Sequence, residues 1–106
     1  MCHCLACQRR TGSVFAAQAR FPSEAVTIVG RSVEYVRVGD EGTRATFRFC
    51  PTCGVTVYYT VEGHAEFVAI PVGVFADPAF PAPKVSVYEE RMHPWVEMPA
   101  DMEHIA

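Results

Sequence analysis

The sequence contains no apolar run near the ~18 residues that a membrane-spanning helix needs, and no block of like charge. Its nine Lys and Arg and twelve Asp and Glu residues are scattered and leave a formal net charge of −3. Nucleic acids and anionic membranes usually attract a clustered basic patch, so we expect neither as a partner. Repeats, low-complexity tracts and Gly- or Ser-rich linkers are also missing, which predicts one domain over residues 1–106.

Several catalytic motifs are absent as well. Without a glycine-rich loop between a strand and a helix, an ATP-dependent or dinucleotide-dependent enzyme is not expected. No local motif indicates Ser-His-Asp or paired-carboxylate catalysis. No secretory signal precedes Cys2, so the five cysteines do not suggest a secreted disulfide scaffold. We expect reduced cysteines and a cytoplasmic location.

The pattern of apolar residues predicts an all-β fold of short antiparallel sheets packed on each other, with one short helix. The helix is expected over residues 5–11, ended by Gly12. The closing segment from Arg91 is expected to be irregular but packed, because Trp95 needs an apolar environment. Strands are expected over residues 14–21, 25–29, 33–38, 43–49, 55–61, 65–74 and 84–88, with a hairpin through residues 39–42. Along residues 43–49, the apolar Ala45, Phe47 and Phe49 are expected to face one way and the polar side chains between them to face solvent.

Cys50 and Cys53 form a Cys-Pro-Thr-Cys-Gly turn between two predicted strands. A two-residue spacer lets two sulfurs enter one zinc coordination sphere, and the glycine gives the backbone the freedom to turn. A structural zinc needs two further donors. The alternatives are a pair of inert buried thiols or a disulfide.

Cys2, Cys4 and Cys7 supply three thiolates within a few residues. Three protein ligands with an open fourth position are typical of catalytic zinc. Three thiolates on a dication leave a net charge of about −1, which makes the zinc a weak Lewis acid toward carbonyls but still keeps an incoming thiol bound as a thiolate. The alternative is one closed structural zinc held by Cys2, Cys4, Cys50 and Cys53, with Cys7 to spare.

Other polar residues near this cluster have weaker signals. Neighbouring residues on an extended backbone point to opposite sides, so we expect the His3 side chain to point outward, away from the sulfurs. Arg9 and Arg10 follow directly and either bind a carboxylate of a peptide-like thiol or are solvated. The histidines at positions 64, 93 and 104 are expected at the surface.

Three segments together resemble the glutathione-dependent formaldehyde-activating enzyme family, which includes centromere protein V. They are CHCLACQRRTGS at residues 2–13, FCPTCG at residues 49–54 and PWV at residues 94–96. The resemblance covers nearly the whole chain. It implies a zinc-containing β-tent, with Cys2, Cys4 and Cys7 as catalytic zinc ligands and Cys50 and Cys53 as two of the four structural zinc ligands.

The family pattern also includes a further Cys-x-Cys on an upstream strand. Because the sequence begins after that point, we expect a domain that lacks the usual N-terminal strand and is shortened at this end. Uncovered strand edges would favour a homodimer.

The activity that the resemblance implies is the addition of glutathione to formaldehyde, giving S-hydroxymethylglutathione, formally a carbon-sulfur lyase reaction in reverse. The expected cofactor is Zn²⁺, with glutathione as co-substrate and a small thiol and aldehyde as partners. Two alternatives stay open: a non-catalytic zinc-stabilised binding module, and a redox protein in which Cys50 and Cys53 cycle between dithiol and disulfide.

Overall fold

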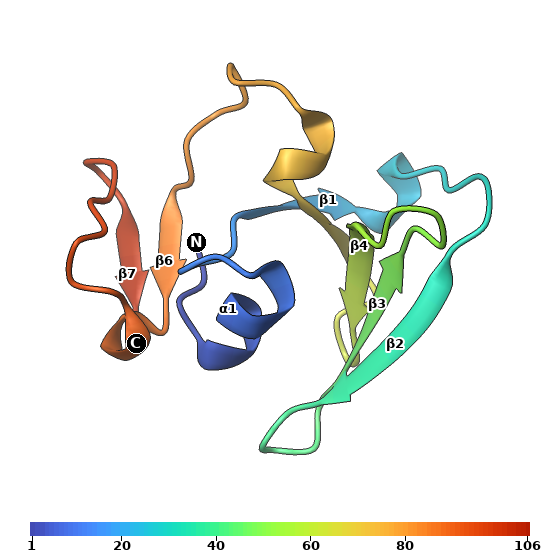
Figure 1. Cartoon of the computed structure of the whole chain (residues 1–106), viewed down its shortest axis with the longest axis horizontal. Helices are drawn as coiled ribbons and strands as arrows, with labels where there is room; N and C mark the ends of the chain where they lie inside the picture. Colours follow the sequence, from blue (N-terminus) through green and yellow to red (C-terminus); the bar gives the residue numbers. More distant parts are fainter. The chain divides into compact units, whose positions relative to one another are not determined.

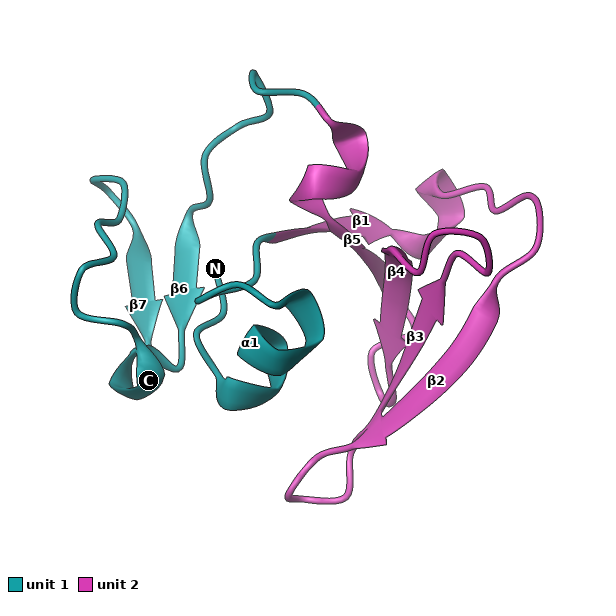
Figure 2. Cartoon of the chain, viewed as in Figure 1, with its two compact units in different colours: residues 1–17, 77–106 teal, residues 18–76 magenta.

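The computed structural model describes all residues from Met1 to Ala106. The chain is mainly β, with seven strands and one short α-helix, as the sequence predicted (Figure 1). It divides into two compact units (Figure 2). Unit 1 comprises Met1–Ala17 and Asp77–Ala106, and unit 2 comprises Gln18–Ala76. No helix is both long enough and apolar enough to cross a membrane.

Unit 2 is built on one antiparallel sheet of five strands. In spatial order the strands are β1 (Gln18–Pro22), β5 (Phe67–Pro71), β4 (Thr56–Val61), β3 (Arg44–Phe49) and β2 (Val33–Val38), with 3₁₀ turns η1 (Ser23–Ala25) and η2 (Val72–Phe75). The hairpin of β2 and β3 has the predicted bounds to within one residue, and β4 follows the cysteine turn as expected.

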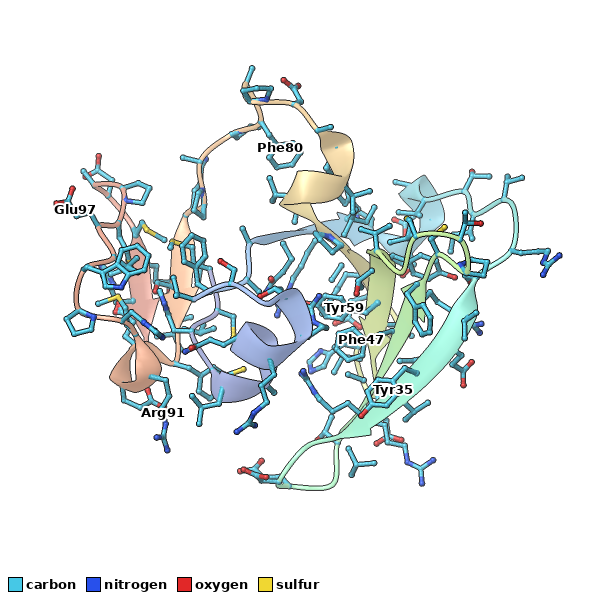
Figure 3. All side chains as sticks on the ribbon, in the orientation of Figure 1. Tyr35, Phe47, Tyr59, Phe80, Arg91 and Glu97 are labelled. Atoms are coloured by element: carbon cyan, nitrogen blue, oxygen red, sulfur yellow. The ribbon has the colours of Figure 1, made fainter.

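A row of aromatic side chains stabilises three of these strands. Tyr35 lies opposite Phe47, which lies opposite Tyr59 on the next strand (Figure 3). The rings of Phe47 and Tyr59 have centroids 4.8 Å apart, and Phe47 is only 3% exposed. Alternation along β3 put Phe47 on the inward face, so this part of the core was predicted correctly.

The predicted strand over residues 25–29 is wrong. After η1 this stretch is extended but pairs with no strand. Its apolar side chains instead help to line a hollow of about 340 Å³ in unit 2, opposite Val57, Ile70 and Phe75. An apolar run can therefore be explained by a packed loop as well as by a strand.

Unit 1 contains the helix α1 (Leu5–Thr11), the strands β6 (Val85–Val87) and β7 (Glu103–Ile105), and the 3₁₀ turn η3 (Glu89–Arg91). The helix has the predicted bounds and ends at Gly12, whose φ of 68° is left-handed. The strands β6 and β7 run parallel, whereas all the sheets of the fold were expected to be antiparallel.

The strand β7 was not predicted, since it is short and largely polar. The packing expected for Trp95 is also wrong, because its side chain is 70% exposed.

Candidate metal centre

The first cysteine lies on an extended segment that is hydrogen-bonded on both sides. The backbone of Cys2 exchanges two hydrogen bonds with Ala16, at 2.8 and 2.9 Å. On its other side, the segment pairs with β6, where the Val87 N–H donates to Met1 and the Val87 carbonyl accepts from His3. Cys2 is buried by these neighbours. The segment is therefore fixed in register with the rest of unit 1.

The other two cysteines are set by the start of α1. Cys4 is the N-cap residue, and its Sγ accepts a hydrogen bond of 3.3 Å from the backbone N–H of Cys7. An N-cap side chain satisfies a backbone donor that has no partner within the helix. Cys7 lies in the first turn and is buried. The helical turn thus brings Cys7 back beside Cys4.

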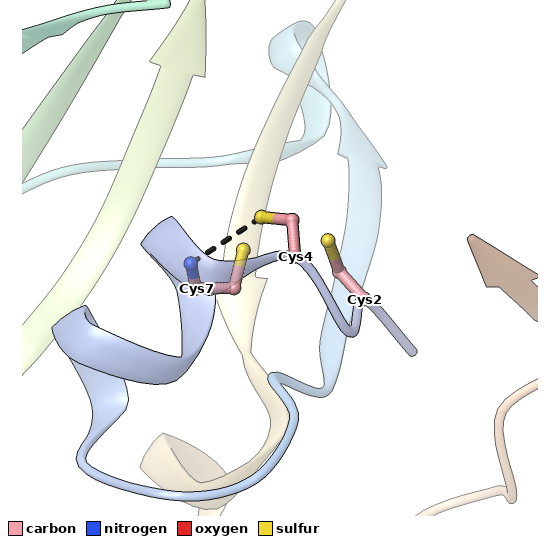
Figure 4. Close-up of side chains that lie close together, drawn as sticks. All are labelled: Cys2, Cys4 and Cys7. Carbon is pink, nitrogen blue, oxygen red and sulfur yellow. Dashed lines mark hydrogen bonds between the residues drawn. The ribbon is translucent and has the colours of Figure 1, made fainter. Parts of the chain in front are cut away.

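The three sulfurs form a compact group, which we call the cysteine cup. The Sγ atoms of Cys2, Cys4 and Cys7 all lie within 4.8 Å of one another. Figure 4 shows the three side chains directed to the same side of the N-terminal segment. Tetrahedral zinc with Zn–S bonds of ~2.3 Å needs sulfurs about 3.8 Å apart, so small side-chain movements suffice. No fourth Cys, His, Asp or Glu atom of unit 1 joins the group.

The cup disfavours negative charge when no cation is bound. The pKa of Cys2 is raised, first by its hydrogen bond with the Cys7 thiol and then by burial. Three neighbouring thiolates would also repel one another. A divalent cation removes both penalties, since it supplies the positive charge that three thiolates need.

His3 is not grouped with the three sulfurs, and its side chain does not reach the surface. Its side chain is 0% exposed, and its Nε2 atom shares a hydrogen bond of 3.1 Å with the hydroxyl of Ser86, also 0% exposed. Burial lowers the pKa of His3. The prediction of an outward side chain is wrong because β6 covers that side of the N-terminal segment.

A family model described as "Glutathione-dependent formaldehyde-activating enzyme" matches residues 1–91. The chain belongs to the glutathione-dependent formaldehyde-activating enzyme family. This confirms the resemblance seen in the sequence and supports glutathione-dependent formaldehyde activation as its general function. No curated protein matches the chain.

The match to the glutathione-dependent formaldehyde-activating enzyme family covers both cysteine motifs. The second motif lies in unit 2, in the turn between β3 and β4. The Cys50 N–H donates to Val55 O, and the Cys50 carbonyl accepts from the Gly54 N–H, both at 2.8 Å. This pairing closes the turn as the Cys-Pro-Thr-Cys-Gly sequence predicted.

The turn favours a thiolate at Cys50. Its Sγ accepts a hydrogen bond of 3.4 Å from the Thr52 N–H. Backbone donation from Cys53 and Thr52, together with the Cys53 thiol, lowers the pKa of Cys50. Within unit 2, no third Cys, His, Asp or Glu ligand atom is grouped with this pair.

The two arginines of the family motif lie in the last turn of α1. Arg9 is exposed and Arg10 is half-buried. On a helix, residues three apart share a face, so Arg10 lies on the side of Cys7 and Arg9 on the opposite side. If one arginine contacts a ligand at the cup, the helix geometry favours Arg10.

Two further residues at this site were missed in the sequence. Gln8 and His93 are joined by a hydrogen bond of 3.0 Å, although they are far apart in the chain. His93 is half-buried, so its expected surface position is wrong, whereas His64 and His104 are exposed as expected. No local spacing links Gln8 to His93, and only the fold of unit 1 brings them together.

Proposed function

We propose that the protein is a zinc-dependent enzyme that adds the glutathione thiol to formaldehyde, giving S-hydroxymethylglutathione. In the reverse direction this is a carbon-sulfur lyase reaction. The observation that carries the proposal is the cysteine cup of a chain that belongs to this family. Its three sulfur atoms lie within 4.8 Å of one another, and unit 1 offers no fourth Cys, His, Asp or Glu ligand atom. Three ligands are typical of catalytic zinc, whereas structural zinc has four.

Cys2, Cys4 and Cys7 would hold the metal. Zinc bound there would keep an incoming glutathione sulfur as a thiolate at neutral pH, in the position that the protein leaves open. Cys50 and Cys53 are proposed as a second pair of zinc ligands, which requires two donors besides their own. The lowered pKa of Cys50 supports a thiolate ligand in that turn.

The reaction is an addition to a carbonyl group. A bond forms between the glutathione sulfur and the carbon of formaldehyde, the π bond of C=O breaks with its electron pair moving to oxygen, and that oxygen takes up the proton that the thiol has lost. The chain's contribution is to bring the two reactants together. Arg10 on the Cys7 side of α1, with Arg9 beside it in sequence, would bind a carboxylate of glutathione.

Metal content per chain tests the proposed ligands. In protein purified without added zinc or chelator, we expect zinc to fall by about one equivalent in Cys7→Ala, since two thiolates hold zinc far more weakly than three. Leu5→Ala, on the same helix and exposed, is the matched control. Zinc retained in Cys7→Ala but lost in Cys53→Ala would contradict the cup and support a closed structural site.

Turnover tests the reaction itself. With ¹³C-labelled formaldehyde and glutathione, magnetisation-transfer NMR reports how fast the aldehyde and its adduct interconvert. We expect the wild type to accelerate this exchange above the uncatalysed rate, and Cys7→Ala to leave it unchanged. A zinc-loaded wild type without acceleration would refute the enzyme and favour the binding module.

A further inference from the structure

The amide of Gln8 uses every one of its polar atoms. Its Nε2 group donates to the carbonyl of His3 at 2.8 Å and to the carbonyl of Arg91 at 3.1 Å. Its Oε1 atom accepts from Nε2 of His93 at 3.0 Å. We call these four residues the Gln8 network. It joins α1 to two segments from opposite ends of the chain, the N-terminal segment and the residues after β6.

The two carbonyls determine which way the amide faces. A carbonyl only accepts hydrogen bonds, so the NH₂ group of Gln8 must face His3 and Arg91. The Oε1 atom then faces His93, whose Nε2 must carry a proton and donate. The two carbonyls therefore fix the orientation of the Gln8 amide, and His93 completes its hydrogen bonding by donating to Oε1. The reversed amide would leave both carbonyl acceptors without a donor.

In the sequence, His3 stands between Cys2 and Cys4, two members of the cysteine cup. Cys2 is held by Ala16, and the N–H of His3 is held by Val87. The carbonyl of His3 accepts its hydrogen bond from the side chain of Gln8, which lies on α1, the helix that carries Cys7. The Gln8 network therefore ties the Cys2 to Cys4 segment to the helix that supplies the third sulfur.

We propose that Gln8, held in place by its hydrogen bond with His93, is a positioning residue that sets Cys2 and Cys4 at metal-binding distance from Cys7. This inference rests on the proposed function, because it assumes that the cup binds zinc. Neither residue is a zinc ligand in this account. Contacts that orient metal ligands typically change metal affinity by about 10-fold to 100-fold when removed.

Zinc affinity, measured by competition with a chromogenic chelator, tests the proposal. Gln8→Leu removes all three hydrogen bonds without adding charge, and His93→Phe removes only the donor to Oε1 of Gln8. We expect both variants to bind zinc about 10-fold to 100-fold more weakly than the wild type. His93→Gln keeps an N–H donor and should recover most of the affinity, while His64→Phe, at an exposed histidine of unit 2, should match the wild type.

Cobalt(II) provides a readout that a merely structural role would not move. Its absorption bands report the number and geometry of the thiolate ligands, so altered bands are expected in folded Gln8→Leu and His93→Phe. Wild-type affinity and bands in both variants would overturn the proposal, even if their thermal stability falls. If Gln8→Leu does not fold, the comparison of His93→Phe with His93→Gln decides.

Cobalt binding by the wild type, Cys7→Ala and Gln8→Leu distinguishes a failure of this inference from a failure of the proposed function. If wild-type protein and Cys7→Ala bind cobalt equally well, the cup itself is wrong. If Cys7→Ala loses the metal while Gln8→Leu keeps wild-type affinity and bands, the cup stands and the positioning role of Gln8 is wrong.

Discussion

The buried pair of His3 and Ser86 permits a sharp test of how the N-terminal segment is held. Replacing Ser86 by alanine removes the hydroxyl that lies 3.1 Å from His3 Nε2. The other ring nitrogen, Nδ1, is already buried without a hydrogen-bond partner. In Ser86→Ala the imidazole therefore has no hydrogen-bond partner at either nitrogen, in a place with no exposure to water.

The size of the effect follows from this burial. Leaving one buried polar atom without its partner costs roughly 1–3 kcal/mol. The removed oxygen is small, so the cavity left behind adds little. Since a domain of this size has a free energy of unfolding of roughly 5–15 kcal/mol, the loss is a substantial fraction. A loss of about 2 kcal/mol corresponds to a decrease in Tm of roughly 8–16 °C.

Urea unfolding of the zinc-loaded protein, followed by circular dichroism, measures the change. The double variant His3→Phe with Ser86→Ala replaces both partners by apolar groups, so we expect it to be more stable than Ser86→Ala alone. Ser13→Ala, at an exposed serine, is the control. A Ser86→Ala midpoint equal to that of the wild type would refute the reasoning, because it would mean that the hydrogen bond contributes nothing.

Two further predictions concern unit 2. Phe47→Ala should lower the free energy of unfolding by about 3–5 kcal/mol because the ring is buried against Tyr59, whereas Tyr35→Ala, at a residue 59% exposed, should cost much less in the same urea titration. The strand β2 is an edge of the sheet and exposes Val38, so we expect a homodimer by sedimentation at micromolar concentration and a monomer in Val38→Lys. A monomeric wild type would contradict this prediction.

The sequence predicted those features that depend on local pattern. Alternation along residues 44–49 identified β3 and its buried face, and Gly12 marked the end of α1 because its left-handed conformation suits glycine. The spacing of Cys2, Cys4 and Cys7 predicted the cup, since an extended segment followed by one helical turn is enough to bring the sulfurs together.

Features that depend on distant partners were not predictable in this way. The run over residues 25–29 is as apolar as a strand, and only the lack of a pairing neighbour makes it a loop. The roles of Ser86 and His93 require β6 and the residues after it to lie beside the N-terminal segment. Nothing in the spacing of these residues reveals that arrangement.

The division of the chain has a consequence for the order in which the metal site can form during synthesis. The cysteines of the cup leave the ribosome before three of the residues that hold them in place, Val87, Arg91 and His93, because these are translated after all of unit 2. The helical turn beside Cys4 can form early, but the contacts with β6 and with the residues after it come later. The fully held cup is therefore a late product of synthesis, and before that its thiols depend on the reducing power of their surroundings to stay unmodified.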